Sequence, residues 1–421
     1  MRRPDALEVF DVVVIGAGPA GLSAACAASG AGDKVLLLER EARPGGILKQ
    51  CIHDGFGLLR YGERLTGPEY AARHEEALAK TSALVSTLSF VTHMEREGEL
   101  YALRYVSREG VTPVKARAIV LATGCRERSS RQIGVHGRHA AGVFTAGSAQ
   151  YYTNVLGMLP TRRCVILGSG DIGLIMARRL TLEGAAVEGV YEAKPSPSGL
   201  KRNIAQCLED FDIPLHLSTT VTRVMGDERL SAVEIADVDA GMQPIAGTER
   251  VVPCDALILS VGLIPENELA ESIGVPLDVR TKGPIVDQRF ETLLPNVFSC
   301  GNALHVNDLV DYVSESGEAA GLAAASSIHE RRLIEVVADD TLLSLVPQRV
   351  DLASADHAVH FYFRASKELQ NVRLVVRAGE RVLLSKRYTA LRPPEMERVA
   401  VDVRGLTETD RLIVSLEEEP R

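Results

Sequence analysis

The chain has 421 residues, more than a single hydrophobic core usually holds, so we expect two or three domains. Apolar residues make up 46% of it, the net charge is −9, and no run of lysine and arginine stands out, which argues against a nucleic-acid partner. Because it has neither an apolar window of about 18 residues nor a recognisable signal peptide, we expect a cytoplasmic protein without an integral membrane segment.

Residues 11–40 form the first unit with a recognisable pattern. An apolar strand leads into a G-x-G-x-x-G turn, a helix of small residues and a second strand that ends at Glu39. Gly16 permits the tight turn, Gly18 lets a pyrophosphate approach the backbone, and Gly21 lets the helix pack on the strand. The helix N-terminus offers free N–H groups to the phosphates, and Glu39 is within reach of an adenosine ribose. The unit predicts a dinucleotide site.

Residues 163–192 repeat this unit. The turn here consists of Gly168, Gly170 and Gly173, and the second strand ends at Glu192. The repeat extends further along the chain, since residues 82–94 resemble 212–225 and residues 118–128 resemble 256–266. The alternative is that each glycine turn only packs a helix on a strand. In that case the complete order of strand, turn, helix, strand and glutamate would occur twice without a ligand to bind. We therefore predict two dinucleotide sites.

Glu192 also bears on the choice of nucleotide. A carboxylate at this position hydrogen-bonds the ribose 2′-OH and repels a 2′-phosphate. Lys194, Lys201 and Arg202 follow it, but no arginine pair stands directly at the strand end. The second site is therefore predicted to bind NAD rather than NADP.

The C-terminal piece, residues 339–421, has a different character. Alternation of apolar and polar residues predicts five strands, at 359–365, 372–378, 381–388, 398–403 and 411–416. We expect a small antiparallel β-sandwich. Phe361, Phe363, Leu374 and Val376 must find cover within only about 80 residues, which makes docking on the preceding domain or on a neighbouring subunit plausible. This piece lacks the cysteines that an iron–sulfur cluster requires. We expect it to hold an assembly together and to do no chemistry.

Four motifs together resemble the flavoproteins with two dinucleotide-binding domains, the pyridine nucleotide–disulfide reductase group. They are GAGPAG with Glu39, LATGCRE at 121–127, GSGDIG with Glu192, and VFSCGN at 297–302. The resemblance implies an α/β fold with two Rossmann-like domains, the NAD domain inserted in the FAD domain. The FAD domain would be discontinuous, at 1–125 and 265–335, and the NAD(P) domain would span 155–262. The segments 126–154 and 263–268 would connect them.

The resemblance also implies FAD and NAD(H) as cofactors, and it assigns residues to each. Its Gly-Asp motif, whose Asp binds the FAD ribityl chain, reads Gly301-Asn302 here, and a helix near Asp308 would point at the flavin. For FAD the implied contacts are Gly16, Gly18, Pro19, Ala20, Gly21, Glu39, Arg40, Gly45, Gly46, Ala122, Thr123, Gly124, Gly301, Asn302, Leu309 and Val310. For NAD they are Gly168, Gly170, Asp171, Ile172, Gly173, Glu192 and Gly262. No metal ligand is implied.

A narrower resemblance covers roughly residues 8–330. The segments 45–71, 141–150 and 197–215 are similar to a flavoprotein found with bacterial glycerol-3-phosphate dehydrogenases. They are also similar to the FAD/NAD-type subunits of opine oxidase, proline dehydrogenase and hydrogen cyanide synthase. This resemblance implies that the partner is a second flavoprotein or dehydrogenase subunit, with a homo-oligomer as the other possibility.

No catalytic residue is certain from the sequence. The seven cysteines form no CxxC pair, so disulfide-reductase activity is not expected. Cys51 lies where the fold passes the flavin and could be a redox thiol or simply a buried one. His53 and His305 could donate protons or bind a carboxylate, and structural roles are as plausible.

We therefore expect an oxidoreductase that moves a hydride between NAD(H) and FAD, and electrons to or from a partner protein or small acceptor. The first alternative is an electron-relay subunit of a heteromeric amino-acid, amine or glycerol-3-phosphate dehydrogenase whose nucleotide domain is mainly a scaffold. The second is a dehydrogenase acting directly on an amino acid, amine or polyol.

Overall fold

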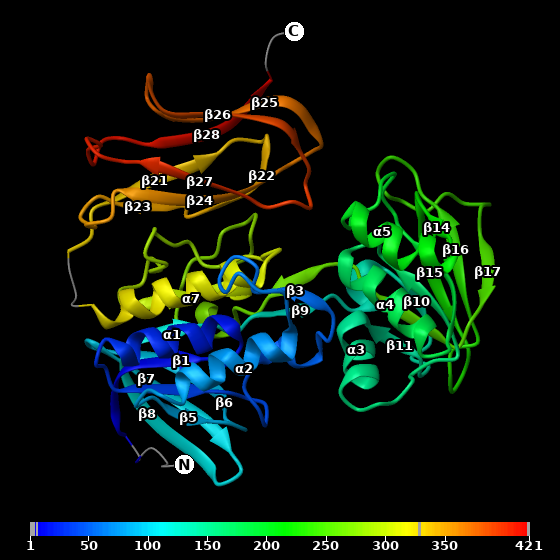
Figure 1. The fold of residues 1–421 in the computed structure, drawn as a ribbon, viewed down its shortest axis with the longest axis horizontal. Coiled ribbons are helices and arrows are strands. Elements are labelled where there is room, and N and C mark those ends of the chain that lie inside the picture. The colour runs from blue at the N-terminus through cyan, green and yellow to red at the C-terminus, as the bar shows by residue number, and fades with distance from the viewer. Residues whose placement is uncertain (1–4, 6, 327–329, 419–421) are drawn as a thin grey trace. The chain divides into compact units, whose positions relative to one another are not determined.

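The computed structural model describes residues 5, 7–326 and 330–418, and it divides into two compact units (Figure 1). The remaining residues fall in the expected FAD-binding and C-terminal domains and lie outside the described part of the chain. Unit 1 comprises Met1–Cys125 and Pro265–Arg421, and unit 2 comprises Arg126–Ile264. The chain runs between them through β9 (Cys125–Glu127) and β19 (Leu263–Pro265), which pair as a small sheet.

The sheet of unit 1 has β1 (Val9–Ile15) at its centre. This strand pairs in parallel with β2 (Val35–Leu38) and with β8 (Gly110–Leu121). Its last four residues, VVVI, are all buried, as is typical of a strand in a sheet that is covered on both faces. The strand order is β5 (Leu84–Ser86), β2, β1, β8. Along the far side of β8 lie β20 (Val297–Ser299), which is parallel to it, and β7 (Leu100–Ser107), which is antiparallel and pairs with β6 (Phe90–Glu97).

Helices α1 (Pro19–Gly30) and α7 (Val310–Ala325) lie side by side over this sheet (Figure 1). Two glycines of α7 make the contact close. A Cβ added to Gly317 would lie 2.1 Å from the Ala20 carbonyl oxygen, and one added to Gly321 would lie 2.3 Å from that of Ala24. Because Gly317 faces Ala20, the first two turns of α7 extend roughly 10 Å beyond the N-terminus of α1.

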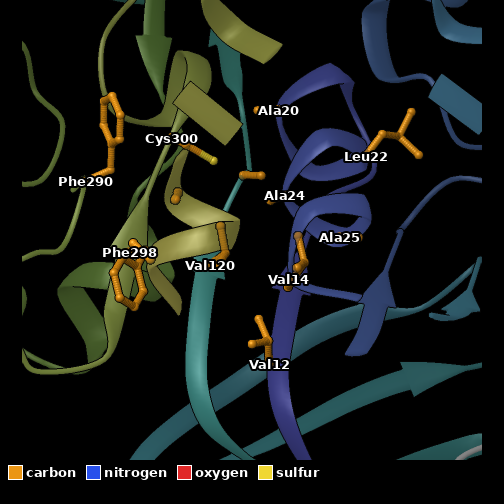
Figure 2. Close-up of a cluster of buried hydrophobic side chains, with 14 of the residues drawn as sticks. Val12, Val14, Ala20, Leu22, Ala24, Ala25, Val120, Phe290, Phe298 and Cys300 are labelled. Atoms are coloured by element: carbon orange, nitrogen blue, oxygen red, sulfur yellow. The ribbon is translucent and has the colours of Figure 1, made fainter. Parts of the chain in front are cut away.

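The core beneath these helices joins β1, β8 and β20 to α1. Figure 2 labels part of it, namely Val12, Val14, Ala20, Leu22, Ala24, Ala25, Val120, Phe290, Phe298 and Cys300. The small residues of α1 bring the helix close to the strands, so its N-terminus is held directly above the carboxyl end of β1.

Unit 2 repeats the sheet plan of unit 1. Its strand order is β14 (Leu215–His216), β13 (Ala186–Tyr191), β12 (Arg163–Leu167), β18 (Ala256–Leu259) and β11 (Val143–Thr145), which are counterparts of β5, β2, β1, β8 and β20. Helix α4 (Asp171–Leu182) follows β12 as α1 follows β1. The duplication predicted from the sequence is thereby confirmed. The prediction that 126–154 merely connects domains is wrong, because β11 belongs to the sheet of unit 2.

The C-terminal strands form two sheets within unit 1. One sheet has the order β23 (Arg349–Asp351), β21 (Leu333–Ala338), β28 (Leu412–Glu418), β25 (Leu369–Ala378) and β26 (Arg381–Leu391). The other has the order β22 (Leu342–Val346), β24 (Ala358–Ala365) and β27 (Glu397–Asp402). The five expected strands are present, but β21 to β23 precede them, so the sheets begin at Leu333 and not at residue 339.

One hydrophobic core lies between these two sheets. Phe361 and Phe363 of β24 are buried against Leu374 and Val376 of β25 in a single cluster. The facing sheet covers these side chains. The C-terminal strands therefore make a self-sufficient layer that rests on the rest of unit 1.

The remaining elements are helices, a two-stranded sheet in unit 1 and a four-stranded sheet in unit 2. Unit 1 also contains β3 (Asp54–Phe56), β4 (Leu65–Thr66), α2 (Gly67–Leu78), α6 (Glu268–Ser272) and the short 3-10 helices η1 (Gly46–Gln50) and η4 (Gly301–Ala303). Unit 2 also contains η2 (Ser130–Ile133), β10 (His136–Gly137), α3 (Ala146–Asn154), α5 (Lys201–Cys207), η3 (Glu209–Phe211), β15 (Thr219–Met225), β16 (Ala232–Asp237) and β17 (Arg250–Pro253). Among the described residues, no helix has both the length and the apolarity needed to cross a membrane.

Candidate functional site

The first glycine turn is tightly packed on two sides and open on the third. Gly16 has φ +99°, and a Cβ on it would lie 2.4 Å from the Ala122 carbonyl oxygen. A Cβ on Gly21 would lie 1.7 Å from the Gly16 oxygen, whereas a Cβ on Gly18 would meet nothing within 4 Å. Helix α1 starts at this turn without a side-chain cap. The turn thus presents uncapped N–H groups to open space, as a phosphate-binding turn requires.

A second glycine pair lies against this turn. The Gly45 N–H donates to the Ala17 carbonyl oxygen at 2.8 Å, and Gly45 has φ +102°. A Cβ on Gly46 would lie 3.0 Å from the Gly18 Cα. Both glycines predicted from the sequence are therefore part of one open backbone cradle with the first turn.

Glu39 places a buried carboxylate beside the cradle. Its Oε2 accepts from the Ala17 N–H at 2.7 Å and its Oε1 accepts from the Glu41 N–H at 2.8 Å. Each oxygen keeps an acceptor site, so the carboxylate is positioned and still able to bind a hydroxyl pair. Arg40, next to it, forms an exposed ion pair with Glu266 at 3.1 Å.

The LATG segment closes the cradle from the β8 side. Ala122 contacts Gly16, as described above, and the Thr123 Oγ1 donates to the Glu266 carbonyl oxygen at 2.6 Å. The Glu266 N–H donates to the Gly124 carbonyl oxygen at 3.0 Å, and Gly124 has φ +73°. These bonds connect the segment through which the chain leaves unit 1 to the segment through which it returns.

Asn302 stands in a polar loop that follows β20. Its Oδ1 accepts from the backbone N–H of Asn307 at 3.0 Å, and its Nδ2 donates to the Cys125 Sγ at 3.6 Å. The preceding Gly301 has φ +61°, and a Cβ on it would lie 2.8 Å from the Ala20 Cβ. The amide is thus held near the start of α1 and can still bind a hydroxyl group.

Helix α7 begins two residues later than the predicted start near Asp308. Leu309 is its N-cap residue and provides no side-chain hydrogen bond, and Val310 is the first helical residue. Asp311 in the first turn is buried, and its Oδ1 accepts a long bond of 3.3 Å from the Arg60 N–H. The α7 N-terminus projects past the α1 turn, where it can favour negative charge on a ligand that extends from the cradle.

The three candidate catalytic residues do not form a reactive group in this structure. None of the seven cysteines is in a disulfide, and burial raises the pKa of the Cys51 thiol to about 12. Cys51 donates to the Ile47 carbonyl oxygen at 3.4 Å, and His53 packs at 5.1 Å from the Phe56 ring. Burial, with the nearby Arg364, lowers the pKa of His305 to about 3. Cys51 is therefore a neutral thiol and His305 a neutral imidazole at physiological pH.

A buried hydrogen-bonded chain connects α2 to α7, and the sequence gives no sign of it. His74 binds the Tyr61 hydroxyl through Nδ1 at 2.9 Å and the Ser314 Oγ through Nε2 at 3.0 Å. The Tyr70 hydroxyl donates to the same Ser314 Oγ at 2.8 Å. Burial, and then the charge of Arg60, lowers the pKa of His74 to about 4. These polar residues carry no motif spacing, so only the packing of the two helices reveals the chain.

A cleft of about 610 Å³ opens beside the first turns of α7, on the side of the C-terminal sheets. Its lining residues include Arg60, Asp311, Tyr312, Glu315, His360 and Arg398. The Arg60 guanidinium pairs with Glu318 at 2.8 Å, and the Arg398 guanidinium pairs with Glu315 at 2.8 Å. Both cations are thus already neutralised by α7. Among the described residues, no cluster of three His, Cys, Asp or Glu side chains could hold a metal ion.

The turn of unit 2 has the same shape as the first. Gly168 has φ +99°, and a Cβ on it would lie 2.0 Å from the Ser260 carbonyl oxygen. A Cβ on Gly173 would lie 2.6 Å from the Gly168 oxygen, whereas the nearest atom to a Cβ on Gly170 would be 3.8 Å away. Of the other predicted residues, Ile172 is partly exposed in the first turn of α4, and Gly262 has φ +94°.

Glu192 is buried like Glu39 but has more partners. Its Oε2 accepts from the Ser169 N–H, the Ser169 Oγ and the Ser198 Oγ, at 3.1, 2.6 and 3.1 Å. Its Oε1 accepts from the Lys194 N–H at 3.1 Å. Asp171 fixes the next part of the same segment, because its Oδ1 accepts from the Leu200 N–H at 2.9 Å. The segment after β13 is thus pinned to the α4 turn.

Comparisons with known proteins agree with this geometry. A family model described as pyridine nucleotide-disulphide oxidoreductase matches residues 10–326. An opine oxidase subunit of Agrobacterium tumefaciens (strain Ach5) is 25% identical over 358 residues, which cover 80% of this chain and 69% of that protein. The alpha subunit of sarcosine oxidase from Corynebacterium sp. (strain P-1) is 26% identical over 417 residues, which cover 90% of this chain and 40% of that protein.

Among solved structures, T. acidophilum thioredoxin reductase matches with a TM-score of 0.62 and 23% identity. The match covers 76% of this chain and 98% of that one, and it shows the fold. The family model spans both glycine turns and reaches the end of α7. The chain therefore belongs to the pyridine nucleotide-disulphide oxidoreductase family, whose FAD- and NAD(P)-dependent oxidoreductase chemistry it shares.

Proposed function

We propose that the protein moves a hydride between NAD(H) and FAD, and electrons to or from a partner protein or small acceptor, without a redox disulfide. The observation that carries the proposal is the duplicated unit: each copy has an open glycine turn and a buried glutamate at the adjacent strand end. The bound flavin and nicotinamide supply the hydride chemistry, and the protein supplies binding and orientation.

We assign FAD to the first copy, so unit 1 is the FAD-binding domain, discontinuous around an inserted NAD domain. Gly18 and the α1 N-terminus would bind the pyrophosphate, and Glu39 the adenosine ribose. Asn302 would bind the ribityl chain, with the α7 N-terminus at the flavin end. The projection of α7 past the α1 turn supports this order, because the pyrophosphate and the flavin ring lie at different depths of one elongated ligand.

We assign the nicotinamide nucleotide to the second copy, with NADH preferred over NADPH. The buried Glu192 carboxylate beside the turn would repel a 2′-phosphate. Lys194, two residues after Glu192, donates from its Nζ to the Ser198 Oγ at 3.3 Å. Its ammonium group is therefore directed to the segment after β13. A lysine also lacks the planar pair of N–H groups with which an arginine binds a phosphate.

The absence of a redox disulfide rests on the cysteines. None of the seven is in a disulfide in the structure, and the pKa of the Cys51 thiol is about 12. Electrons would then leave the flavin directly for an acceptor outside the chain. The relatives named above are subunits of larger oxidases, which supports a separate partner protein. A cytoplasmic location, in which such thiols stay reduced, remains a prediction.

The rival proposal is an electron-relay subunit whose nucleotide domain is mainly a scaffold. The observation in its favour is the crowded Glu192, whose Oε2 already has three protein donors. Anaerobic mixing of the FAD-loaded protein with NADH separates the two proposals. Rapid bleaching of the flavin absorbance by NADH, and slower bleaching by NADPH, supports the main proposal. A protein that holds FAD but is not bleached by either nucleotide supports the scaffold.

A further inference from the structure

The segment between Asn302 and α7 is held from outside by the C-terminal sheets. Arg364 on β24 donates from Nη2 to the Val306 carbonyl oxygen at 3.0 Å, and its guanidinium also pairs with the Asp308 carboxylate. The same carboxylate accepts from the Met396 N–H at 2.6 Å. The Arg364 side chain is 14% exposed and the Asp308 side chain 35% exposed, so this fork is partly shielded from water.

A second arginine of the C-terminal sheets contacts α7 itself. Arg398 on β27 pairs with Glu315 at 2.8 Å, and its guanidinium lies over the Tyr312 ring at 5.6 Å. The Tyr312 ring meets Tyr362 of β24 edge-on at 5.7 Å. Together, the two arginines attach the three-stranded sheet to the first two turns of α7 and to the residues just before them.

This attachment matters because it adds outside contacts to the local hydrogen bonds of the held segment. The α7 N-terminus has no side-chain cap, and the Asn302 Oδ1 accepts from the Asn307 backbone N–H at 3.0 Å and from the Asn307 Nδ2 at 3.3 Å. The Gly301 N–H donates to the Ser316 Oγ of α7 at 3.0 Å, and the contacts at Val306 and Asp308 hold the segment between Asn302 and α7 from outside. A small displacement there would move both groups assigned to the flavin.

We propose that Arg364 is a positioning residue for FAD, and that the C-terminal sheets complete the FAD site by holding residues 305–309 in place. The inference rests on the FAD assignment made above. It gives these sheets a role within the single chain, beyond the assembly role expected from the sequence. Arg364 touches neither of the groups assigned to FAD, so its effect would be transmitted through the backbone at Val306 and the Asp308 carboxylate.

The test compares three substitutions in the full-length chain after removal of FAD. Arg364→Gln should raise the FAD dissociation constant by up to about tenfold, because part of the free energy of the lost charge-assisted bond would be needed to order residues 305–309 on binding. It should also shift the flavin midpoint potential, because the α7 N-terminus moves. Arg364→Lys keeps the charge but loses the fork, and should lie between parent and Arg364→Gln. Arg377→Gln is the control, since Arg377 pairs with Glu417 at 2.8 Å on a different sheet.

The possible outcomes distinguish a failure of this inference from a failure of the FAD assignment on which it rests. A parent chain that takes up no FAD contradicts the proposed function itself. A parent that binds FAD, with Arg364→Gln binding it equally well and at the same potential, overturns the role of Arg364 alone. If Arg364→Gln does not fold, Asp308→Asn replaces it, because that change weakens the same fork and keeps an acceptor for Met396. FAD affinity and potential in Asp308→Asn that equal those of the parent would also overturn the inference.

Discussion

At the scale of single residues, the two buried glutamates differ in their remaining capacity to bind a ligand. The Glu39 carboxylate has one protein donor on each oxygen, whereas the Glu192 carboxylate has three on one oxygen and one on the other. An oxygen with three donors has no acceptor site left, so a ribose must use the other oxygen or displace a serine. We infer that Glu39 acts mainly on its ligand and that Glu192 acts on the adjacent segment as well.

The matched substitutions Glu39→Gln and Glu192→Gln test this difference. Glu39→Gln removes a charged acceptor for the ribose and should weaken FAD binding by about 1.5–3 kcal/mol, which is roughly tenfold to a hundredfold. Glu192→Gln should leave FAD content unchanged and narrow the preference for NADH over NADPH, because the repulsive charge is gone. Each variant is the control for the other, with FAD titration and stopped-flow bleaching as measurements. FAD loss in Glu192→Gln would contradict the assignment.

Cys51 is expected to take no part in electron transfer. With a pKa of about 12 the thiol stays protonated near neutral pH, so it lacks the thiolate that redox chemistry needs. Cys51→Ser should retain NADH-driven flavin bleaching, and reductive titration should give two electrons per FAD in parent and variant alike. Uptake of four electrons by the parent and two by the variant would show the thiol to be a redox centre.

At the scale of elements, the close contact of α1 and α7 holds the two proposed FAD-binding helix ends in register. Gly317→Ala would place a methyl group 2.1 Å from the Ala20 carbonyl oxygen, so the helices must separate. We expect a loss of about 1–3 kcal/mol in the free energy of unfolding, with weaker FAD retention. Gly30→Ala is the control, because a Cβ there meets nothing within 4 Å, and it should be neutral or slightly stabilising. Chemical denaturation measures both, and equal stabilities would contradict the register argument.

The elements that carry a periodic or repeated pattern could be predicted from the sequence. Both glycine turns, the glutamates at the strand ends and the five late strands are where the pattern places them. The first residues of some elements could not be predicted from the sequence. Helix α7 starts without a side-chain cap, and the short strands β21 to β23 show no clear alternation of apolar and polar residues. The role of 126–154 was missed because β11 has three residues and gains its place only by pairing with β18.

The site residues that were not predicted depend on contacts distant in sequence. His74 meets Ser314 across 240 positions, and Arg364 meets Asp308 across 56. Neither pair belongs to a motif, and each residue alone reads as an ordinary surface or core position. Reasoning from spacing finds groups that one turn or strand brings together, and these pairs form only when separate elements pack.

At the scale of the whole molecule, the free energy of unfolding should depend on pH through a buried acid and two buried histidines, whose effects run in opposite directions. Asp287 is buried, and burial, with the charge of Glu291, raises its pKa to about 6. Its stabilising contribution is present below the unfolded value near 4 and is lost as the pH rises through 6. His74 and His305, whose pKa values are lowered to about 4 and about 3, act oppositely and lose stability as the pH falls below about 6.5.

Asp287→Asn isolates the first of these contributions. The variant cannot ionise, so it should escape a loss of about 3 kcal/mol that the parent suffers between about pH 4 and pH 7. Relative to the parent, it should be similar in stability near the lower pH and more stable near the higher one. Asp340→Asn, at an exposed position, should show no such pH-dependent gain. Chemical denaturation at both pH values gives the difference, and a gain that is constant with pH would contradict the argument.

The pairing of β9 with β19 brings the two ends of unit 2 together. The Arg128 N–H donates to the Gly262 carbonyl oxygen at 3.2 Å, and the Glu266 N–H donates to that of Gly124 at 3.0 Å. A module whose entry and exit strands are neighbours can be removed, and a two-residue hairpin can close the gap without stretching the host chain. The same geometry would let another module be grafted at this point, and under the proposed assignment of the nicotinamide nucleotide to unit 2 such a graft would exchange the nucleotide specificity in one step.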